Sequence, residues 1–291
     1  MHPLSKGMSC RPNNIHRLLR RRARAPRRQG RPAYVGRTLH QRHHRKRNRL
    51  LLRLYVTLRL LPELPAESRK LRKNHLRLAD IFLELQEKGA ANINLVTGTQ
   101  FAPSIVRALD LAKPKLHIPV VFNCGGYEKL ETIRDLADYV DIWLPDLKYM
   151  DSGLAKKYSA APDYFEKASA AIKEMIRLTG GLSWNKRNPS MLDRGVIIRH
   201  MVLPGAKEDS IRLLHWIREN LPDHQYLISI MSQYTPFYRS TEYPEINRRI
   251  TSYEYNKVVD TAIDLGLTEG FMQERSSAKE EYTPPFDCEG L

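Results

Sequence analysis

The stretch Tyr139-Val140-Asp141-Ile142-Trp143-Leu144-Pro145-Asp146-Leu147-Lys148 joins an apolar run to charged groups. The run Val140–Leu144 is short and rich in branched and aromatic side chains, which predicts a buried strand. Asp146 and Lys148 follow it two residues apart, so we expect their side chains to point to the same side. They can form a structural ion pair or face a ligand together.

The same unit repeats along the chain. Strands are expected over residues 92–97, 118–122, 140–144, 196–203 and 226–231 and near Phe271, and helices over 78–89, 103–109, 129–136, 164–178, 210–220 and 253–265. Apolar strands that alternate with amphipathic helices are typical of a parallel sheet covered by helices. The residues therefore predict an α/β fold. Residues 179–193 are expected to form a long surface loop.

Polar or glycine-containing groups follow the predicted strands. They are Thr97-Gly98-Thr99, Asn123-Cys124-Gly125-Gly126, Asp146-Leu147-Lys148, Pro204-Gly205 and Ser232-Gln233-Tyr234. Parallel sheets bind ligands at the carboxyl ends of their strands, so these groups predict a site. The two glycines also suit a plain backbone turn.

Two neighbouring polar residues, Arg199 and His200, lie inside an apolar strand. A charge there is costly unless it is paired or faces a cavity. Adjacent strand residues face opposite ways, so we expect one of the two to face the site. Cys124 is interpreted as a buried, small apolar group.

Charge divides the chain into two parts. Residues 1–77 hold 23 Lys and Arg against two Asp and Glu, a net charge of +21, and the remainder carries −5 of the total of +16. No apolar run of about 18 residues occurs, which argues against a spanning helix. Cys10, Cys124 and Cys288 are too far apart for a disulfide framework or zinc spacing, so a cytoplasmic protein is expected.

The basic leader, residues 1–77, admits three interpretations: a poorly ordered segment, an Arg-rich transit peptide, and a nucleic-acid arm. Its composition favours the poorly ordered segment first, then the transit peptide. The nucleic-acid interpretation gives the alternative function, a basic arm on a barrel of metabolic origin.

Three segments of the acidic body, residues 78–291, carry a family resemblance: 92–99, 141–149 and 198–205. Together with Met231–Pro236 and Pro284–Asp287, they resemble radical S-adenosylmethionine proteins. The nearest group is that of the pyruvate formate-lyase activating enzyme homologues. Gly98 and Gln100 depart from that pattern, because relatives usually have Pro and His at these places.

The resemblance implies a partial (β/α) TIM-like barrel that binds S-adenosylmethionine at the strand ends. The residues implied for the cofactor or an associated cation are Thr97, Thr99, Asn123, Gly125, Gly126, Asp146, Lys148, Arg199 and Gln233. No residue is assigned as catalytic or as a metal ligand. The implied partners are a glycyl radical enzyme as protein substrate and an electron donor such as flavodoxin or ferredoxin. No membrane partner is expected, and nucleic acid is disfavoured as a partner.

The implied chemistry is reductive cleavage of S-adenosylmethionine by a [4Fe-4S] cluster, followed by hydrogen abstraction from an unknown substrate. Three thiolates in a Cys-x3-Cys-x2-Cys motif hold such a cluster and leave one iron open. This chain has no such motif, and the basic leader occupies its place. We therefore expect the chain to be inactive in its present reading frame.

A shifted reading frame restores the motif. Each shifted codon takes the last two bases of one codon and the first base of the next. The junctions from Ala33 to His43 then permit His-x-Trp-Glu-Glu-Pro-Cys-Ile-Ser-Gly. Those from Arg45 to Leu64 permit Gly-Ser-Gly-Thr-Val-Phe-Phe-Ser-Gly-Cys-x-Leu-Arg-Cys-Val-Tyr-Cys-Gln-Asn. The hypothesis is that residues 1 to about 76 are out of frame and that the frame resumes near Arg77.

Overall fold

The computed structural model describes residues 69–236 and 238–272, which form a mixed α/β fold. The sheet contains β1 (Ile93–Val96), β2 (Val120–Cys124), β3 (Ile142–Pro145), β5 (Leu192–Met201), β6 (Leu227–Met231) and β7 (Gly270–Met272) in that spatial order. All neighbours in this order are parallel, and β4 (Ser183–Trp184) pairs antiparallel with β5. The predicted parallel sheet is confirmed.

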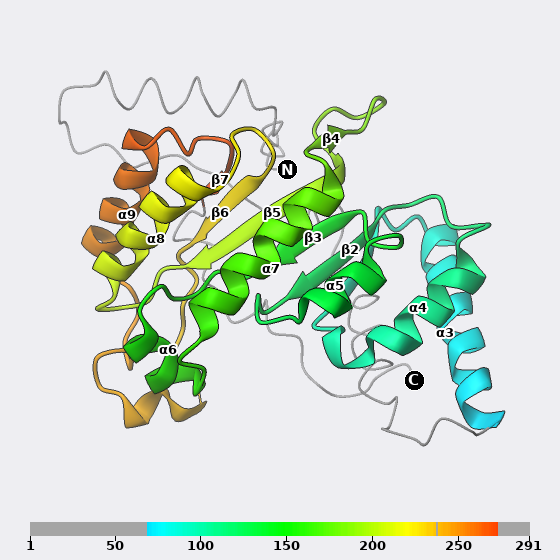
Figure 1. The fold of residues 1–291 in the computed structure, drawn as a ribbon, viewed down its shortest axis with the longest axis horizontal. Helices are drawn as coiled ribbons and strands as arrows, with labels where there is room; N and C mark the ends of the chain where they lie inside the picture. The colour runs from blue at the N-terminus through cyan, green and yellow to red at the C-terminus, as the bar shows by residue number, and fades with distance from the viewer. Residues whose placement is uncertain (1–68, 237, 273–291) are drawn as a thin grey trace, which may run out of the picture.

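Helices follow the strands along the chain, as predicted. They are α3 (Arg69–Glu87), α4 (Ala102–Ala112), α5 (Leu130–Leu136), α6 (Ser152–Ser159), α7 (Tyr164–Thr179), α8 (Lys207–Asn220) and α9 (Ser252–Asp264), with short 3-10 turns η1 (Thr99–Phe101) and η2 (Tyr238–Glu242). Figure 1 shows an open, twisted sheet. By the strand order, β1 and β7 form its two edges. Among the described residues the sheet is not closed, so it forms a partial barrel.

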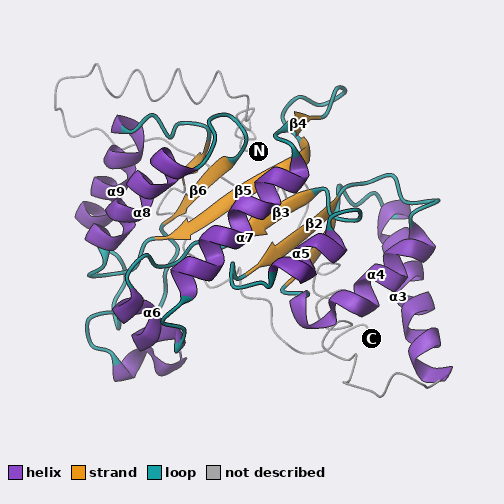
Figure 2. Ribbon diagram, in the orientation of Figure 1, coloured by secondary structure: helices purple, strands orange, loops and turns teal. Residues whose placement is uncertain are grey.

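The two faces of the sheet differ. Alternate residues such as Phe122, Trp143 and Ile198 are buried in the large core beneath the helices, and Phe122 and Trp143 pack with ring centroids 5.5 Å apart. Figure 2 shows α5 and α7 crossing this face. The opposite face carries a smaller apolar cluster: Val121, Ile142, Leu144, Leu192, Ile197 and Leu227. Asn123, Asp146 and Arg199 lie on this second face, at the carboxyl ends of their strands.

Two parts of the sequence prediction were incomplete. Residues 179–193 were expected to form a loop, but they contain β4, and β5 begins at Leu192 rather than at residue 196. Helix α6 was missed because its eight residues include Gly153 and little apolar periodicity. Its local signal was Asp151, whose side chain accepts a hydrogen bond from Leu154 N at 2.9 Å.

Residues 1–68 lie outside the described part of the chain, and with them most of the basic leader. The expectations of poor order, a transit peptide or a nucleic-acid arm concern that segment. Helix α3 begins at Arg69 and runs through the predicted boundary at residues 77 and 78 without a break. Within the described ranges, no helix is long and apolar enough to cross a membrane.

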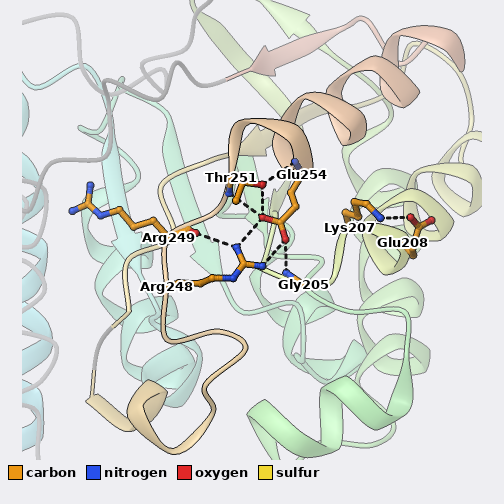
Figure 3. A network of polar contacts seen from close by, with 7 residues as sticks. All are labelled: Gly205, Lys207, Glu208, Arg248, Arg249, Thr251 and Glu254. Atoms are coloured by element: carbon orange, nitrogen blue, oxygen red, sulfur yellow. Dashed lines mark hydrogen bonds and ion pairs between the residues drawn. The ribbon is translucent and has the colours of Figure 1, made fainter.

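A buried carboxylate, Glu254, joins the loop after β5 to the start of α9 (Figure 3). Its oxygens accept hydrogen bonds from Gly205 N at 2.7 Å, from both terminal nitrogens of Arg248 at 2.7 and 2.9 Å, and from Thr251 N at 2.9 Å. Thr251 and Glu254 form a capping box. The Arg248 guanidinium, with the backbone donors, lowers the pKa of Glu254.

Replacing this carboxylate should destabilise the fold in a pH-dependent way. We expect Glu254→Gln to lower the free energy of unfolding by about 2–3 kcal/mol at neutral pH, because hydrogen bonds to a charged group are lost. A carboxyl whose pKa is lowered by folding stabilises fully above its unfolded pKa of about 4.3 and loses that effect as the pH falls further. The difference between wild type and variant in urea unfolding should therefore shrink below that pH.

The matched control is Glu208→Gln. Glu208 pairs with its neighbour Lys207, and its side chain is 70% exposed, so its loss should have little effect. Equal losses for the two variants would show that Glu254 does not hold these elements together.

Candidate functional site

Arg199 connects three strands at the carboxyl edge of the sheet. Its Nη2 donates to Asn123 Oδ1 at 2.6 Å and lies 2.5 Å from Asp146 Oδ1. Asn123 belongs to β2, Asp146 follows β3, and Arg199 belongs to β5. Lys148 Nζ lies 3.9 Å from Asp146 Oδ2. The structure thus brings together four of the residues predicted from the strand ends.

Hydrogen-bonding capacity remains unused in this cluster. Asp146 Oδ1 meets Arg199 Nη2 as an ion pair. Asp146 Oδ1 and Arg199 Nε are buried and lack a hydrogen-bond partner within the described residues. The Arg199 and Asp146 side chains are only 18% and 20% exposed. Unpaired buried polar atoms are costly, and at a strand end they indicate a place where a ligand completes the hydrogen bonds.

The Tyr164 hydroxyl ties the glycine turn to the Asp146–Lys148 segment. It lies 2.8 Å from both Gly125 O and Asp146 O, and it accepts a hydrogen bond from Lys148 N at 3.2 Å. Its one proton can go to only one carbonyl at a time. Burial raises the pKa of Tyr164, so the phenol stays neutral and remains a donor. Sequence reasoning missed Tyr164, because nothing local distinguishes it from other core tyrosines.

Gly126 is required for the close approach of these two loops. Its φ is +85°, and a Cβ on it would lie 2.1 Å from Asp146 O. Gly125 differs, since a Cβ there would meet nothing within 4 Å. The backbone-turn interpretation therefore applies to Gly126, while Gly125 borders open space beside the Arg199 cluster.

His200 occupies the other side of β5, as the alternation of strand residues requires. Its Nδ1 lies 2.7 Å from Leu147 O and its Nε2 lies 2.9 Å from Ser210 Oγ on α8. The carbonyl can only accept, so Nδ1 carries the proton and Nε2 accepts from the serine. Burial lowers the pKa of His200, which keeps the ring neutral. His200 thus fixes the backbone between Asp146 and Lys148, and Arg199 alone faces the site.

Thr99 and Glu128 form a second polar group at the same edge. Thr99 Oγ1 donates to Glu128 Oε1 at 3.1 Å. Glu128 is 8% exposed and was not among the predicted site residues. Cys124 lies in the same region and is buried as predicted. Burial raises the pKa of its thiol, and the charges of Glu128 and Asp146 raise it further.

Two further predicted residues make other contacts. Thr97 has an exposed side chain and a φ of 53°, and its backbone N donates to Asn123 O at 2.9 Å. Gln233 Nε2 donates to Met231 Sδ at 3.8 Å, a contact within its own strand end. That Thr97 and Gln233 contact a ligand stays a prediction.

The described residues do not suit an iron–sulfur cluster. Cys124 is the one cysteine in the described ranges, it is 1% exposed, and its raised pKa disfavours the thiolate that binds iron. No group of three His, Cys, Asp or Glu in these ranges is placed to hold a metal ion. A cluster therefore has no binding site in this part of the chain.

The chain was compared with known proteins and structures. No family model matches the sequence. An uncharacterized protein of Methanocaldococcus jannaschii is 31% identical over 180 residues, which are 60% of this chain and 47% of that protein. The chain therefore spans about half the length of this curated relative.

A solved structure is also similar in part. It is a domain of pyruvate-formate lyase-activating enzyme from Bacteroides vulgatus, with a TM-score of 0.46 and 14% identity over 62% of this chain and 98% of that one. This TM-score is below the level that establishes a common fold. The fold is therefore assigned from the strands and helices of this chain alone.

The two glycines should respond differently to the same substitution. Gly126→Ala should lower the free energy of unfolding by at least about 2 kcal/mol, because an alanine at positive φ is strained and its Cβ overlaps Asp146 O. Gly125→Ala should cost about 0.5 kcal/mol or less. Urea unfolding of both variants measures the difference, and equal losses would contradict the described approach of the loops.

Proposed function

We propose that the folded body is the barrel of an S-adenosylmethionine enzyme similar to the glycyl radical enzyme activases. The observation that carries the proposal is the buried Arg199–Asp146 pair, whose unused hydrogen-bonding atoms lie at the carboxyl edge of a parallel sheet beside Gly125. The resemblance of the strand ends supports the same function. The glycyl radical substrate and the flavodoxin or ferredoxin donor remain part of this proposal.

The residues at this edge fit the amino-acid end of S-adenosylmethionine. Arg199 and Lys148 supply positive charge and donors for a carboxylate. Asn123 and Asp146 hold the Arg199 guanidinium in place, and Tyr164 and His200 fix the backbone that carries Asp146 and Lys148. When bound, S-adenosylmethionine would supply the adenosyl group that abstracts hydrogen in this class of enzyme.

The cluster required for that reaction has no ligands in the described residues, so the proposal includes the shifted frame. The environment of His75 on α3 supports the shifted frame. His75 is 6% exposed, and its Nε2 has no hydrogen-bond partner in the described part of the chain. Burial and the charge of Arg107 lower its pKa. The shifted junctions on either side of His75 permit only isoleucine or threonine, which suit a buried helix position better than an unpaired imidazole.

The full chain should bind the ligand without performing the reaction. We expect it to bind S-adenosylhomocysteine, and we expect anaerobic reconstitution with iron and sulfide to give no four-iron cluster and no cleavage of S-adenosylmethionine. Lys148→Ala should weaken S-adenosylhomocysteine binding roughly threefold to tenfold, because a donor to the carboxylate is lost. Isothermal titration measures the affinity for S-adenosylhomocysteine. The iron content of the reconstituted protein shows whether a cluster has formed.

Lys156→Ala is the control for charge, since Lys156 is exposed in the last turn of α6. It should leave the affinity unchanged. Equal weakening by both lysine variants, or no binding by the wild-type chain, would refute the binding site. A four-iron cluster in this polypeptide would refute the reading-frame part.

A further inference from the structure

Four tyrosine rings form a continuous row beside the strand ends, which we call the tyrosine row. Tyr127 stacks on Tyr164 with ring centroids 6.0 Å apart, and Tyr164 meets Tyr149 at 5.6 Å. Tyr149 lies 6.4 Å from Tyr158. Tyr127 is 47% exposed, Tyr164 and Tyr149 are buried, and Tyr158 is partly exposed. The row therefore runs from one surface ring through the core to another ring near the surface.

Each end of the row donates its phenolic proton to a carboxylate. Tyr127 donates to Asp163 Oδ1 at 2.5 Å, and Tyr158 donates to Glu245 Oε1 at 2.7 Å. Both carboxylates come from segments distant in sequence from the tyrosine they accept from. A carboxylate at this distance can take up a proton, so both end phenols have a base within reach.

The two middle tyrosines have no such base. The Tyr164 hydroxyl lies 2.8 Å from the carbonyl oxygens of Gly125 and Asp146, which accept hydrogen bonds but do not take up the proton. Tyr149 accepts a hydrogen bond from Ser159 Oγ at 3.1 Å. Burial raises the pKa of both phenols, so they stay protonated. The middle of the row is thus chemically different from its ends.

This difference matters for oxidation. A phenol that loses an electron becomes a strong acid, and it is a stable radical only when its proton moves to a nearby base. The end tyrosines meet this condition, and the middle ones do not. An electron vacancy in the middle of the row would therefore pass to the neighbouring ring and stop at an end.

The fifth ring beside the row, Tyr243, does not extend it. Its centroid lies 5.3 Å from that of Tyr158, but its hydroxyl donates to no carboxylate within the described ranges. The Lys157 cation lies over both rings, at 5.5 Å from Tyr158 and 5.6 Å from Tyr243, which disfavours removal of an electron. Glu245 offsets this charge by pairing with Lys157 at 2.5 Å and with the Tyr158 hydroxyl. Tyr158 is therefore the end of the path on this side.

We propose that the tyrosine row carries oxidising equivalents from the strand ends to Tyr127 and Tyr158. A one-electron oxidant at the strand ends takes an electron from a ring and is reduced, and each ring is then reduced by its neighbour. At Tyr158 the proton passes to Glu245 and leaves a neutral phenoxyl radical. A soluble thiolate returns one electron and becomes a thiyl radical, and the proton returns from Glu245. The row would thus protect the residues at the strand ends from oxidation, and this inference does not rest on the proposed function.

The test places an oxidant at the strand ends of the full chain. Gly125→Cys supplies the attachment point for a ruthenium polypyridyl complex, because a Cβ at Gly125 meets nothing within 4 Å. Cys10→Ser and Cys288→Ser restrict the label to this position, since Cys124 is buried. Light and a cobalt(III) quencher convert the complex to ruthenium(III), which takes one electron from a phenol. A nitroso spin trap captures the resulting radical, and peptide mass spectrometry locates it.

The labelled chain should carry trap adducts at Tyr127 and Tyr158. Tyr149→Phe keeps a ring in the row but removes the phenol that passes the electron. It should lose the Tyr158 adduct and keep the Tyr127 adduct. Glu245→Gln keeps a hydrogen-bond acceptor for Tyr158 but removes the base, so it should also lose the Tyr158 adduct. Plain aromatic packing predicts neither of these selective losses.

Tyr139 is the matched control. Its hydroxyl donates to Asp110 Oδ1 at 2.6 Å, so it also has a base, but it has no ring contact with the row among the described residues. It should carry no adduct, and Tyr139→Phe should leave both end adducts unchanged.

Each other result overturns the proposal. These results are the absence of a Tyr158 adduct in the labelled chain, its persistence in Tyr149→Phe or Glu245→Gln, and an adduct at Tyr139. Loss of both end adducts in Tyr149→Phe also overturns it, because the change would then not be confined to the path. None of these outcomes concerns S-adenosylhomocysteine binding, so the proposed function is tested separately.

Discussion

The contact of Arg199 with Asn123 and Asp146 is the constraint on which the carboxyl edge of the sheet depends. A largely buried guanidinium is stable only with partners, and those partners come from the two strands on one side of β5. The contact therefore fixes the relative positions of β2, β3 and β5 where a parallel sheet binds ligands. The remaining groups, Tyr164, His200 and Gly126, hold the backbone that makes this contact.

The two faces of the sheet have different roles. The helix-covered face buries Phe122, Trp143 and Ile198 and supplies the rigid support. His200 lies on this face and reaches the Leu147 carbonyl, so the core directly positions the charged segment after β3. On the opposite face, Arg199 and Asp146 have buried polar atoms without a hydrogen-bond partner among the described residues. The core and the proposed ligand site thus lie on opposite sides of the same strands.

Much of this arrangement follows from local sequence. The strands and long helices were predicted because apolar periodicity decides them. Asn123, Asp146 and Lys148 were predicted because the carboxyl ends of parallel strands meet, and Arg199 because a charge inside an apolar strand must be paired or face a cavity. Local pattern did not identify α6 or β4, which are short and depend on tertiary packing. It also did not identify Tyr164 or Glu128, whose importance comes from contacts with distant loops. The only local signal for Glu128 is its place two residues after Gly126.

The described fold and the composition of the chain lead to one account of its unusual charge. The acidic body has an ordered polar edge at its strand ends, and the described residues offer no ligands for the cluster that the proposed chemistry requires. The basic leader, when read in a shifted frame, permits those ligands at the required spacing. The basicity then reflects the reading frame and not selection for an anionic partner.

Independent determination of the nucleotide sequence that encodes residues 1–80 tests this account most directly. The account predicts a one-base displacement between the codons of Leu64 and Arg77, with three upstream cysteine codons in the frame that continues into the barrel. A single open frame through this region, with no cysteine codons at the shifted junctions, would contradict it.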